Sequence, residues 1–366
     1  SSALQESLNE FFKKYNSAVS VEYMSNIEIE EGLNLNVCMD ARYVIPKKVK
    51  EFLPDIVISF GGNIFAGIKE QFRKFAGEFE HWLVQEDGRV VDLYKSITTI
   101  FECKPEYFFQ YCVKVADKDQ LNDREYYHGL KNYVDSVVYP DFPYSHVYAI
   151  KEMVEKIPSD SILHLSINDS IRITNFFKLN PRIKTYANIG THGIDGCLSS
   201  FLGQAAAGNK QSYLVIGDLA FFYDMNAMRL RHIKNNVHVL LINNEGGSEF
   251  YFNHMWKDEA SDLHTTARHH TKAEGWVKSN NFIYLSAHDK ESMQEALKEF
   301  MRSDLDKPVF LEVFTEMKTD SDVIYDFFDL SRPKDVQSET IRRSKEFIKA
   351  TIGQEKAQKI AGLFKK

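Results

Sequence analysis

The sequence predicts an α/β protein with two doubly wound domains, each built on a mostly parallel sheet with helices on both faces. Three observations support this prediction. Short apolar runs of strand length alternate with longer segments of helical spacing along almost the whole chain. The chain has 366 residues, which exceeds the roughly 100–200 residues of a single domain. Pro140 and Pro143 interrupt a polar stretch where neither a helix nor a central strand can continue.

The first predicted domain covers residues 1–115, and a linker with one helix covers 116–144. In chain order, the expected elements are a helix over 8–15, strands over 18–22 and 55–60, a helix over 66–75, and strands over 81–84 and 97–101. The turn at 61–63, Gly-Gly-Asn, follows a strand. We interpret it as a structural turn, because a lone glycine pair is a weak signal for nucleotide binding.

The second predicted domain covers residues 145–366 and alternates more regularly. The expected strands are 162–165, 184–187, 213–216, 237–242, 282–285 and 308–314, and the expected helices are 170–177, 194–207, 221–233 and 292–302. This alternation predicts a parallel sheet that is covered on both faces. The tail 341–366 carries eight basic residues against two glutamates and has apolar residues at helical spacing. Such a helix either packs on its own domain or docks to a partner or an anionic surface.

The composition excludes several classes of protein. Hydrophobic residues make up 43% and charged residues 27%, which excludes a mostly disordered chain. The net charge of -7 argues against nucleic-acid binding, and no apolar run approaches the roughly 18 residues of a membrane span. The four cysteines form no CxxC pair, which favours reduced thiols and a cytoplasmic protein. The chain begins with Ser1 rather than Met, so we expect a processed chain or a piece of a longer protein.

Polar residues follow two neighbouring strands of the second domain. Asp218 comes after the strand 213–216, and Asn244 comes after the strand 237–242. In a right-handed βαβ unit both strand ends lie at the same edge of the sheet, where open α/β folds bind ligands. Both side chains are hard oxygen donors, as Mg²⁺ or Ca²⁺ prefers. Gly246 and Gly247 allow the backbone to approach a bound anion closely, so the sequence predicts a site for a metal and a diphosphate.

This spacing of Gly-Asp, a helix and Asn-Asn-x-Gly-Gly resembles the signature of thiamine-diphosphate enzymes. The Gly-Ile-Asp-Gly element at 193–196, Leu219 after Asp218, and the Asp-Met-Asn element at 224–226 resemble one family among them, the 2-succinyl-5-enolpyruvyl-6-hydroxy-3-cyclohexene-1-carboxylate synthases of menaquinone biosynthesis. Residues 145–314 resemble the diphosphate-binding domain of that family, and residues up to about 115 resemble most of its central domain.

The resemblance implies thiamine diphosphate and Mg²⁺ as cofactors. It implies that Asp218 and Asn244 bind Mg²⁺ through their side chains and Gly246 through its carbonyl, and that Ile194 supports the cofactor in its bent form. The cofactor-binding residues carried over from the family are Gly193, Ile194, Asp195, Gly217, Asp218, Leu219, Asn244, Gly246 and Gly247.

The resemblance also implies substrate-binding positions. Arg172 matches an arginine that binds a substrate carboxylate, although a surface arginine is an equally good interpretation. Asn168 stands where the family has a serine, and His192 where it typically has a small residue. Ile189 departs more seriously, because the family has an arginine there that helps to hold an acidic substrate. A different acceptor, or another 2-oxo acid, therefore becomes plausible.

The expected function is decarboxylation of a 2-oxo acid with transfer of the remaining fragment to an acceptor. The alternatives are another thiamine-diphosphate decarboxylase or acetohydroxyacid-type synthase, and a non-catalytic module that retains the cofactor site. The family supplies the cofactor-activating glutamate from a separate pyrimidine-binding domain, which no segment here resembles. We therefore expect a fragment that alone binds the cofactor weakly and is inactive, from a homodimer or homotetramer.

Two further groups of residues are not assigned to the site. His254, His264, His269 and His270 fit no compact zinc motif, and we interpret them as part of a mobile polar loop near the site mouth. Phe250 and Phe252 either line the substrate pocket or pack in the core.

Overall fold

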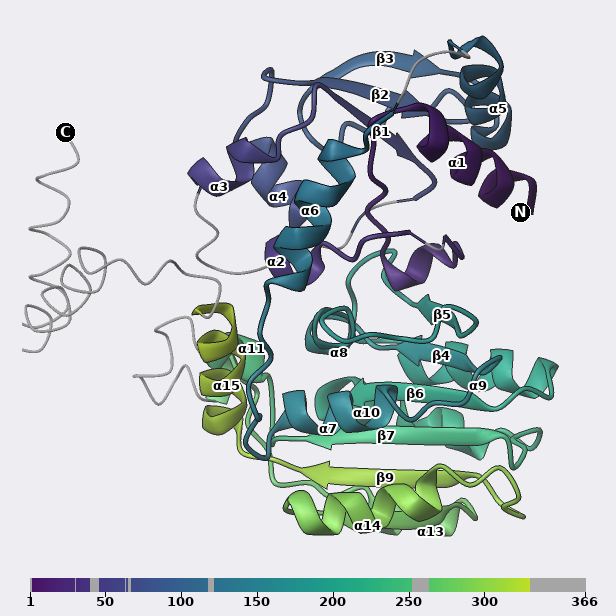
Figure 1. Ribbon diagram of the computed structural model, residues 1–366. Helices are drawn as coiled ribbons and strands as arrows, with labels where there is room; N and C mark the ends of the chain where they lie inside the picture. The colour runs from purple at the N-terminus through teal and green to yellow at the C-terminus, as the bar shows by residue number, and fades with distance from the viewer. Residues whose placement is uncertain are drawn as a thin grey trace, which may run out of the picture. The chain divides into compact units, whose positions relative to one another are not determined.

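Two parallel sheets organise the chain (Figure 1). The computed structural model describes residues 2–29, 31–39, 46–62, 64, 67–117, 122–251 and 263–329, all within one unit, Ser1–Leu330. Within these ranges, one sheet has three strands in the order β1-β2-β3, and the other has six in the order β5-β4-β6-β7-β9-β8. Every strand pair in both sheets is parallel, which confirms the predicted α/β class.

The small sheet has helices on both faces. Its elements are α1 (Ser2–Lys14), β1 (Ile56–Phe60), α4 (Ile68–Arg73), β2 (Glu80–Val84), β3 (Ile97–Phe101) and α5 (Pro105–Val115). Ile58 and Phe60 of β1 pack in one apolar cluster with residues of α1 and α5. Val57, which points to the opposite face, packs in a second cluster with Phe72 of α4. Short helices η1 (Tyr23–Ser25), α2 (Asn36–Met39) and α3 (Pro46–Glu51) and the longer α6 (Glu125–Asp135) complete this half of the chain.

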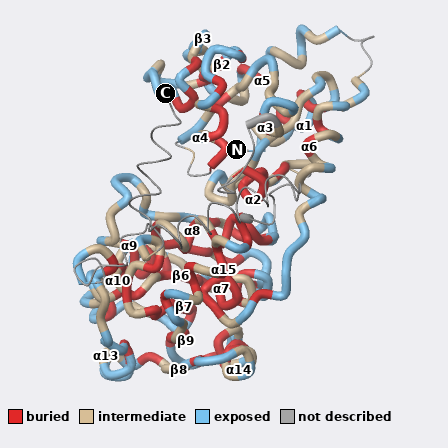
Figure 2. Tube along the Cα trace, turned by 90° about the vertical axis from the view of Figure 1, so that its left-hand side faces the viewer, coloured by how far each residue is buried: buried red, intermediate tan, exposed pale blue. Residues whose placement is uncertain are grey.

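The large sheet contains β4 (Ile162–Leu165), β5 (Lys184–Ala187), β6 (Ser212–Gly217), β7 (Val237–Asn243), β8 (Ile283–Ala287) and β9 (Val309–Phe314). Its strands β6 and β7 are buried along almost their whole length, as Figure 2 shows. Tyr213 and Val215 pack with residues of α7 (His146–Val154) and α14 (Lys290–Phe300). Leu214 and Ile216 pack on the other face with residues of α9 (Cys197–Ala207) and α10 (Asp218–Asp224). The predicted doubly wound arrangement of this sheet is therefore confirmed.

The predicted strands of the large sheet and all three strands of the small sheet agree with the structure to within a residue or two. The predicted strand over 18–22 is wrong, because Ser20 makes only an isolated bridge to Leu33 and no partner strand extends it among the described residues. The predicted helix 194–207 begins only at Cys197, because Gly196 adopts a left-handed φ of 72°. The predicted helix 221–233 instead begins at Asp218 and becomes the 3₁₀ helix η2 (Met225–Arg229).

Some predictions concern residues outside the described ranges. These are the tail 341–366, Asn63 of the 61–63 turn, Phe252 and His254. The boundaries between domains stay a prediction. The cysteines are all described and are free thiols, with Cys38 and Cys197 buried. No helix among the described residues combines the length and the apolarity that crossing a membrane requires.

Candidate functional site

The candidate site lies at the carboxyl edge of the large sheet, where β6 and β7 end side by side. Gly217 of β6 pairs with Ile242 of β7, so the residues that follow the two strands are neighbours. Asp218 is 2% exposed and Asn244 is 6% exposed. The two residues that the sequence predicts as a metal-binding pair are thus brought together and buried.

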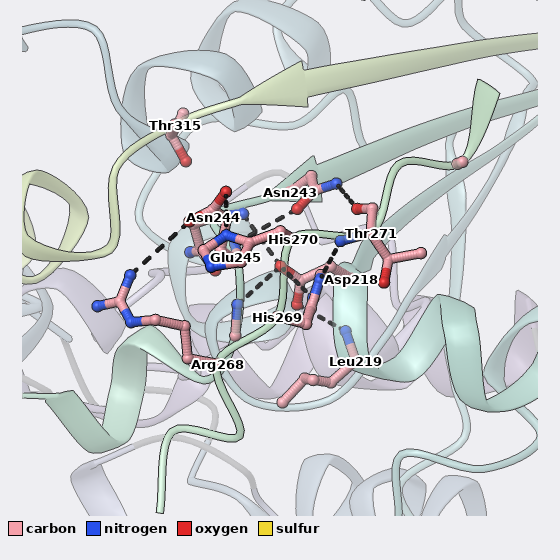
Figure 3. Close-up of polar contacts among 12 residues, drawn as sticks. Asp218, Leu219, Asn243, Asn244, Glu245, Arg268, His269, His270, Thr271 and Thr315 are labelled. Atoms are coloured by element: carbon pink, nitrogen blue, oxygen red, sulfur yellow. Dashed lines mark hydrogen bonds and ion pairs between the residues drawn. The ribbon is translucent and has the colours of Figure 1, made fainter. Parts of the chain in front are cut away.

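Asp218 holds the loop that follows β7. Its Oδ2 accepts hydrogen bonds from the backbone N–H of Asn244 (3.1 Å) and of Gly246 (3.0 Å). Its Oδ1 accepts from the backbone N–H of Leu219 (2.6 Å). Figure 3 shows this carboxylate between the loop and the start of α10. One side chain therefore fixes the relative position of two strand ends.

The side chain of Asn244 has a defined orientation. Its Nδ2 donates to Oδ2 of Asp320 (2.8 Å), a residue of α15 (Met317–Asp329) that is fully buried. An ionised carboxylate can only accept hydrogen bonds, so the group of Asn244 that faces Asp320 is the NH₂. The amide oxygen of Asn244 is therefore left for another partner. Among the described residues, none donates a hydrogen bond to this Oδ1. A carboxylate and a free amide oxygen fit a hard divalent cation.

The loop after β7 requires glycine. Glu245 has a φ of 65° and Gly246 a φ of 146°. A Cβ added at Gly246 would lie 2.5 Å from the backbone oxygen of Thr266. The chain is packed closely here because Gly247 donates its N–H to the same oxygen at 2.7 Å. The Gly-Gly pair of the motif therefore permits a close approach of two backbones.

The histidine-rich segment comes closer to the site than the sequence indicates. The Nε2 of His269 lies 3.4 Å from Oδ2 of Asp218, and this carboxylate raises the pKa of His269. The backbone N–H of His269 also donates to the carbonyl of Glu245 (3.0 Å). His264 and His270 are exposed. Within the described part of the chain, no three His, Cys, Asp or Glu side chains are arranged to hold a metal ion.

The residues predicted to bind substrate follow β4. Asn168 precedes α8 (Asp169–Thr174) with a φ of 58° and a ψ of -121°, a conformation that favours glycine. Arg172 lies on α8 with its Nη1 3.4 Å from Oδ1 of Asp169 and 3.6 Å from Oε1 of Glu249. These three charged residues and Ser248 help to line a small hollow. In this structure Arg172 is therefore paired with two carboxylates.

The remaining predicted residues lie beside α9. Gly193 and Ile194 are half-buried, whereas His192 and Asp195 are exposed. Ile194 packs against the apolar cluster that α9 and α10 share with the sheet. The carbonyl of Asp195 accepts a hydrogen bond from Nδ2 of Asn188 (3.2 Å), which ties this segment to the loop after β5. Phe250 is 42% exposed, which argues against the core-packing alternative.

A set of curated relatives resembles this chain, although no protein-family model matches it. A protein of Phocaeicola vulgatus is 33% identical over 288 residues, and one of Bacteroides fragilis is 34% identical over 286 residues; each match covers 77% of this chain. A protein of Bacteroides thetaiotaomicron is 33% identical over 297 residues, 80% of this chain. Each is named 2-succinyl-5-enolpyruvyl-6-hydroxy-3-cyclohexene-1-carboxylate synthase.

The chain is homologous to these synthases. This homology confirms the resemblance to the synthase family that the sequence motifs indicate. The matches cover 51% to 53% of the relatives, so the chain spans about half the length of the synthases it matches.

Ile189, where the resemblance implies an arginine, lies in apolar surroundings. Ile189 follows β5 and is partly buried against both apolar clusters of the large sheet. Its side chain offers no donor to a carboxylate. Ile189 thus presents an apolar side chain at the position where the resemblance implies an arginine.

The sequence reasoning missed two buried residues, Asp320 and His146. Asp320 follows β9 by six positions, and Thr315, directly after β9, donates its hydroxyl to Oδ2 of Asp320 (2.6 Å). The strand-end argument applied to β6 and β7 also applies to β9, because β9 pairs with β7 in parallel. That argument would have found Thr315, whereas Asp320 lies further on, within α15. No sequence signal marks His146, which starts α7.

Proposed function

We propose that this chain carries the cation- and diphosphate-binding half of a thiamine-diphosphate enzyme that decarboxylates a 2-oxo acid and transfers the remaining fragment to an acceptor. The arrangement of Asp218, Asn244 and Gly246 carries the proposal. A buried carboxylate and an amide oxygen lie at adjacent strand ends, in a protein homologous to synthases of this class. The related synthases, by their name, form a succinylated cyclohexene carboxylate, and we extend a reaction of that class to this protein.

The residues of this chain would bind and orient the cofactor. Asp218, the Oδ1 of Asn244 and the carbonyl of Gly246 would bind Mg²⁺, which holds the diphosphate. Ile194 would support the bent cofactor from the apolar cluster under α9. When bound, thiamine diphosphate supplies the electron sink for decarboxylation. We expect the working enzyme to be a homodimer or homotetramer that takes its cofactor-activating glutamate from outside this chain.

Arg172 would bind the carboxylate of the 2-oxo acid. Its Nη1 lies beside Asp169 and Glu249, so a substrate carboxylate would share the guanidinium with these two residues. An arginine suits this role because its planar fork can bind a carboxylate through two hydrogen bonds.

Ile189 favours a second candidate, a related enzyme with a less acidic acceptor. The apolar environment of Ile189 cannot bind the carboxylate that an arginine would hold in the synthases. A desolvated, unpaired carboxylate in such a place would cost about 1–3 kcal/mol or more. The second candidate therefore shares the cofactor site and differs in the acceptor.

The test uses the natural protein that contains this chain. Release of CO₂ is measured with thiamine diphosphate and Mg²⁺ on a panel that includes 2-oxoglutarate and pyruvate. We expect turnover of at least one 2-oxo acid and its loss in Asp218→Ala. Turnover of 2-oxoglutarate together with the acidic acceptor of the menaquinone-pathway synthases favours the first candidate, and turnover with neutral acceptors favours the second.

A binding experiment separates a catalytic protein from a module that only retains the site. We expect the isolated 366-residue chain to bind thiamine diphosphate and Mg²⁺ weakly in a calorimeter, since half of the cofactor would lack its partner domain. Tight binding by the isolated chain would contradict this expectation. A natural protein that binds the cofactor tightly but releases no CO₂ from any 2-oxo acid would support the non-catalytic alternative.

A further inference from the structure

We propose that Asp320 is a positioning residue of the cation site, which holds the amide of Asn244 so that its oxygen faces the cation. This inference rests on the proposed function, because it assumes that Asn244 binds Mg²⁺. Asp320 would act through Asn244 and would not itself touch the cation. His146 and Thr315 would hold Asp320 in place.

Asp320 is suited to this role because hydrogen bonds from three residues hold its carboxylate in place. Its Oδ2 accepts from Nδ2 of Asn244 (2.8 Å) and from the hydroxyl of Thr315 (2.6 Å). Its Oδ1 accepts from the backbone N–H of His146 (2.8 Å) and lies 3.4 Å from Nδ1 of the same residue. An ionised carboxylate offers about four lone-pair positions, and three of them accept these hydrogen bonds. The imidazole of His146 lies beside the same carboxylate.

The amide of Asn244 needs such a partner. An asparagine can turn its oxygen and nitrogen ends with little cost unless its neighbours distinguish them. Next to a carboxylate, only the NH₂ end makes a hydrogen bond, and the reverse orientation would place two oxygens together. Asp320 therefore selects the one orientation in which Asn244 presents oxygen to the site shared with Asp218.

His146 anchors Asp320 from the opposite side. The imidazole is 2% exposed and lies between two carboxylates, with Nδ1 3.4 Å from Asp320 and Nε2 3.6 Å from Asp169. Asp169 in turn contacts Arg172 and accepts a hydrogen bond from Ser248 (3.3 Å). The anchor of Asp320 is thus built from residues of α7 and α8, together with Thr315 after β9.

The decisive variant is Asp320→Asn, made in the natural protein that contains this chain. An amide at position 320 can donate to the oxygen of Asn244 as well as accept from its nitrogen, so both orientations of Asn244 become available. Loss of such an outer partner of a metal ligand typically weakens metal binding about 10–100-fold. Binding of Mn²⁺ in the presence of thiamine diphosphate is measured from the electron paramagnetic resonance signal of the free ion, together with unfolding in denaturant without metal.

Glu312→Gln is the matched control. Glu312 is also a fully buried carboxylate that accepts from an asparagine amide, Nδ2 of Asn243, at 2.7 Å. We expect this variant to lose stability as Asp320→Asn does, but to change the Mn²⁺ affinity by less than about 3-fold, far below the 10–100-fold effect of a metal ligand's partner. Equal weakening in both variants would overturn the proposal, because it would show a general response to loss of a buried charge.

The exchange Asp320→Asn with Asn244→Asp separates positioning from simple packing. In the exchanged pair the amide at position 320 donates to one oxygen of the carboxylate at position 244, and the other oxygen again faces the site. We expect the exchange to regain Mn²⁺ affinity relative to Asp320→Asn by more than Asn244→Asp alone raises it in the unmodified protein, whereas a purely structural role predicts equal gains. Asp320→Asn should also add little to the loss of Mn²⁺ affinity caused by Asn244→Ala, since Asp320 influences the cation only through Asn244.

The outcomes distinguish this inference from the proposed function. If the unmodified protein binds no Mn²⁺, or if Asp218→Ala leaves binding unchanged, the proposed cation site is wrong and the inference is wrong with it. If Asp218→Ala removes binding while Asp320→Asn leaves it within about 3-fold, below the range for an outer partner, only the inference is overturned.

Discussion

Two buried histidines at opposite edges of the large sheet have opposite electrostatic environments. His146 lies at the carboxyl edge between Asp320 and Asp169. His238, near the start of β7 at the amino edge, lies between two uncharged groups, the carbonyl of Phe300 and the side-chain amide of Gln211, each 2.7 Å from a ring nitrogen. Burial alone would lower the pKa of His146, but the two carboxylates raise it to about 10. Burial lowers the pKa of His238 to about 4.

The difference shows where this protein concentrates its charge. Burial disfavours the charged form of any histidine, and only nearby carboxylates reverse that effect. The carboxyl edge contains the buried carboxylates of Asp218, Glu312 and Asp320, whereas the described polar contacts of His238 at the amino edge are neutral. Buried charges are costly unless they are paired. A cation-binding function would require buried carboxylates to be concentrated at one edge, whereas packing alone would not require it.

The largest effect is expected from Gly246→Ala at the carboxyl edge. The added Cβ would lie 2.5 Å from the backbone oxygen of Thr266, and Gly246 has a φ of 146°. Strain of roughly 1–3 kcal/mol and overpacking of roughly 1–3 kcal/mol give a loss of about 4 kcal/mol in unfolding free energy. Denaturant unfolding measures this loss.

Gly208→Ala at the amino edge is the control for this prediction. A Cβ at Gly208 would meet no heavy atom closer than 3.9 Å, and its φ is -124°. We expect a change within about 0.5 kcal/mol, as at ordinary surface positions. Similar losses for both glycines would contradict the view that the carboxyl-edge loop is the more constrained.

The second prediction concerns pH and has opposite signs for the two histidines. The folded pKa of His146 lies above its ordinary value of 6.5, so its charge stabilises the fold below 6.5, and this contribution disappears as the pH rises through about 10. The folded pKa of His238 lies below 6.5, so its contribution is present above 6.5 and disappears as the pH falls through about 4. For His238 the effect is on the order of 3 kcal/mol.

The measurement compares His146→Gln and His238→Gln with the unmodified protein over the pH range in which the fold is intact. The stability difference caused by His146→Gln should shrink as the pH rises, and the difference caused by His238→Gln should shrink as the pH falls. If the stability differences of both variants changed in the same direction with pH, the electrostatic environments of the two histidines would be alike.

The sequence predicted the large sheet and the Asp218–Asn244 pair because both depend on local patterns. The apolar run at β4 and the strand-end rule at β6 and β7 need no knowledge of distant contacts. Asp320 and His146 could not be predicted in this way, because their hydrogen bond joins residues 174 positions apart. The left-handed conformation of Gly196 and the approach of His269 to Asp218 likewise depend on tertiary packing.

The smallest effect is expected at Asp289, which resembles Asp218 in local sequence position. Each aspartate follows a strand of the large sheet at its carboxyl edge and stands at the start of a helix. Asp289 is exposed and accepts from the backbone N–H of Ser292 (2.7 Å), which completes a capping box for α14. Asp218 instead accepts from the loop after a different strand, at Asn244 and Gly246. The sequence alone does not distinguish a carboxylate that caps its own helix from one that joins two strand ends.

Asp289→Ala should therefore cost about 1 kcal/mol of stability, the usual value of an N-terminal cap. It should leave Mn²⁺ affinity unchanged, because α14 supplies no residue to the candidate site. Asp289→Ser should recover most of the loss, since serine is also a good cap. Unfolding in denaturant and Mn²⁺ binding are measured on the same samples as Asp218→Ala. If Asp289→Ala weakened Mn²⁺ binding as strongly as Asp218→Ala, the cation site would extend along the whole carboxyl edge, and the special role of the β6 and β7 strand ends would be wrong.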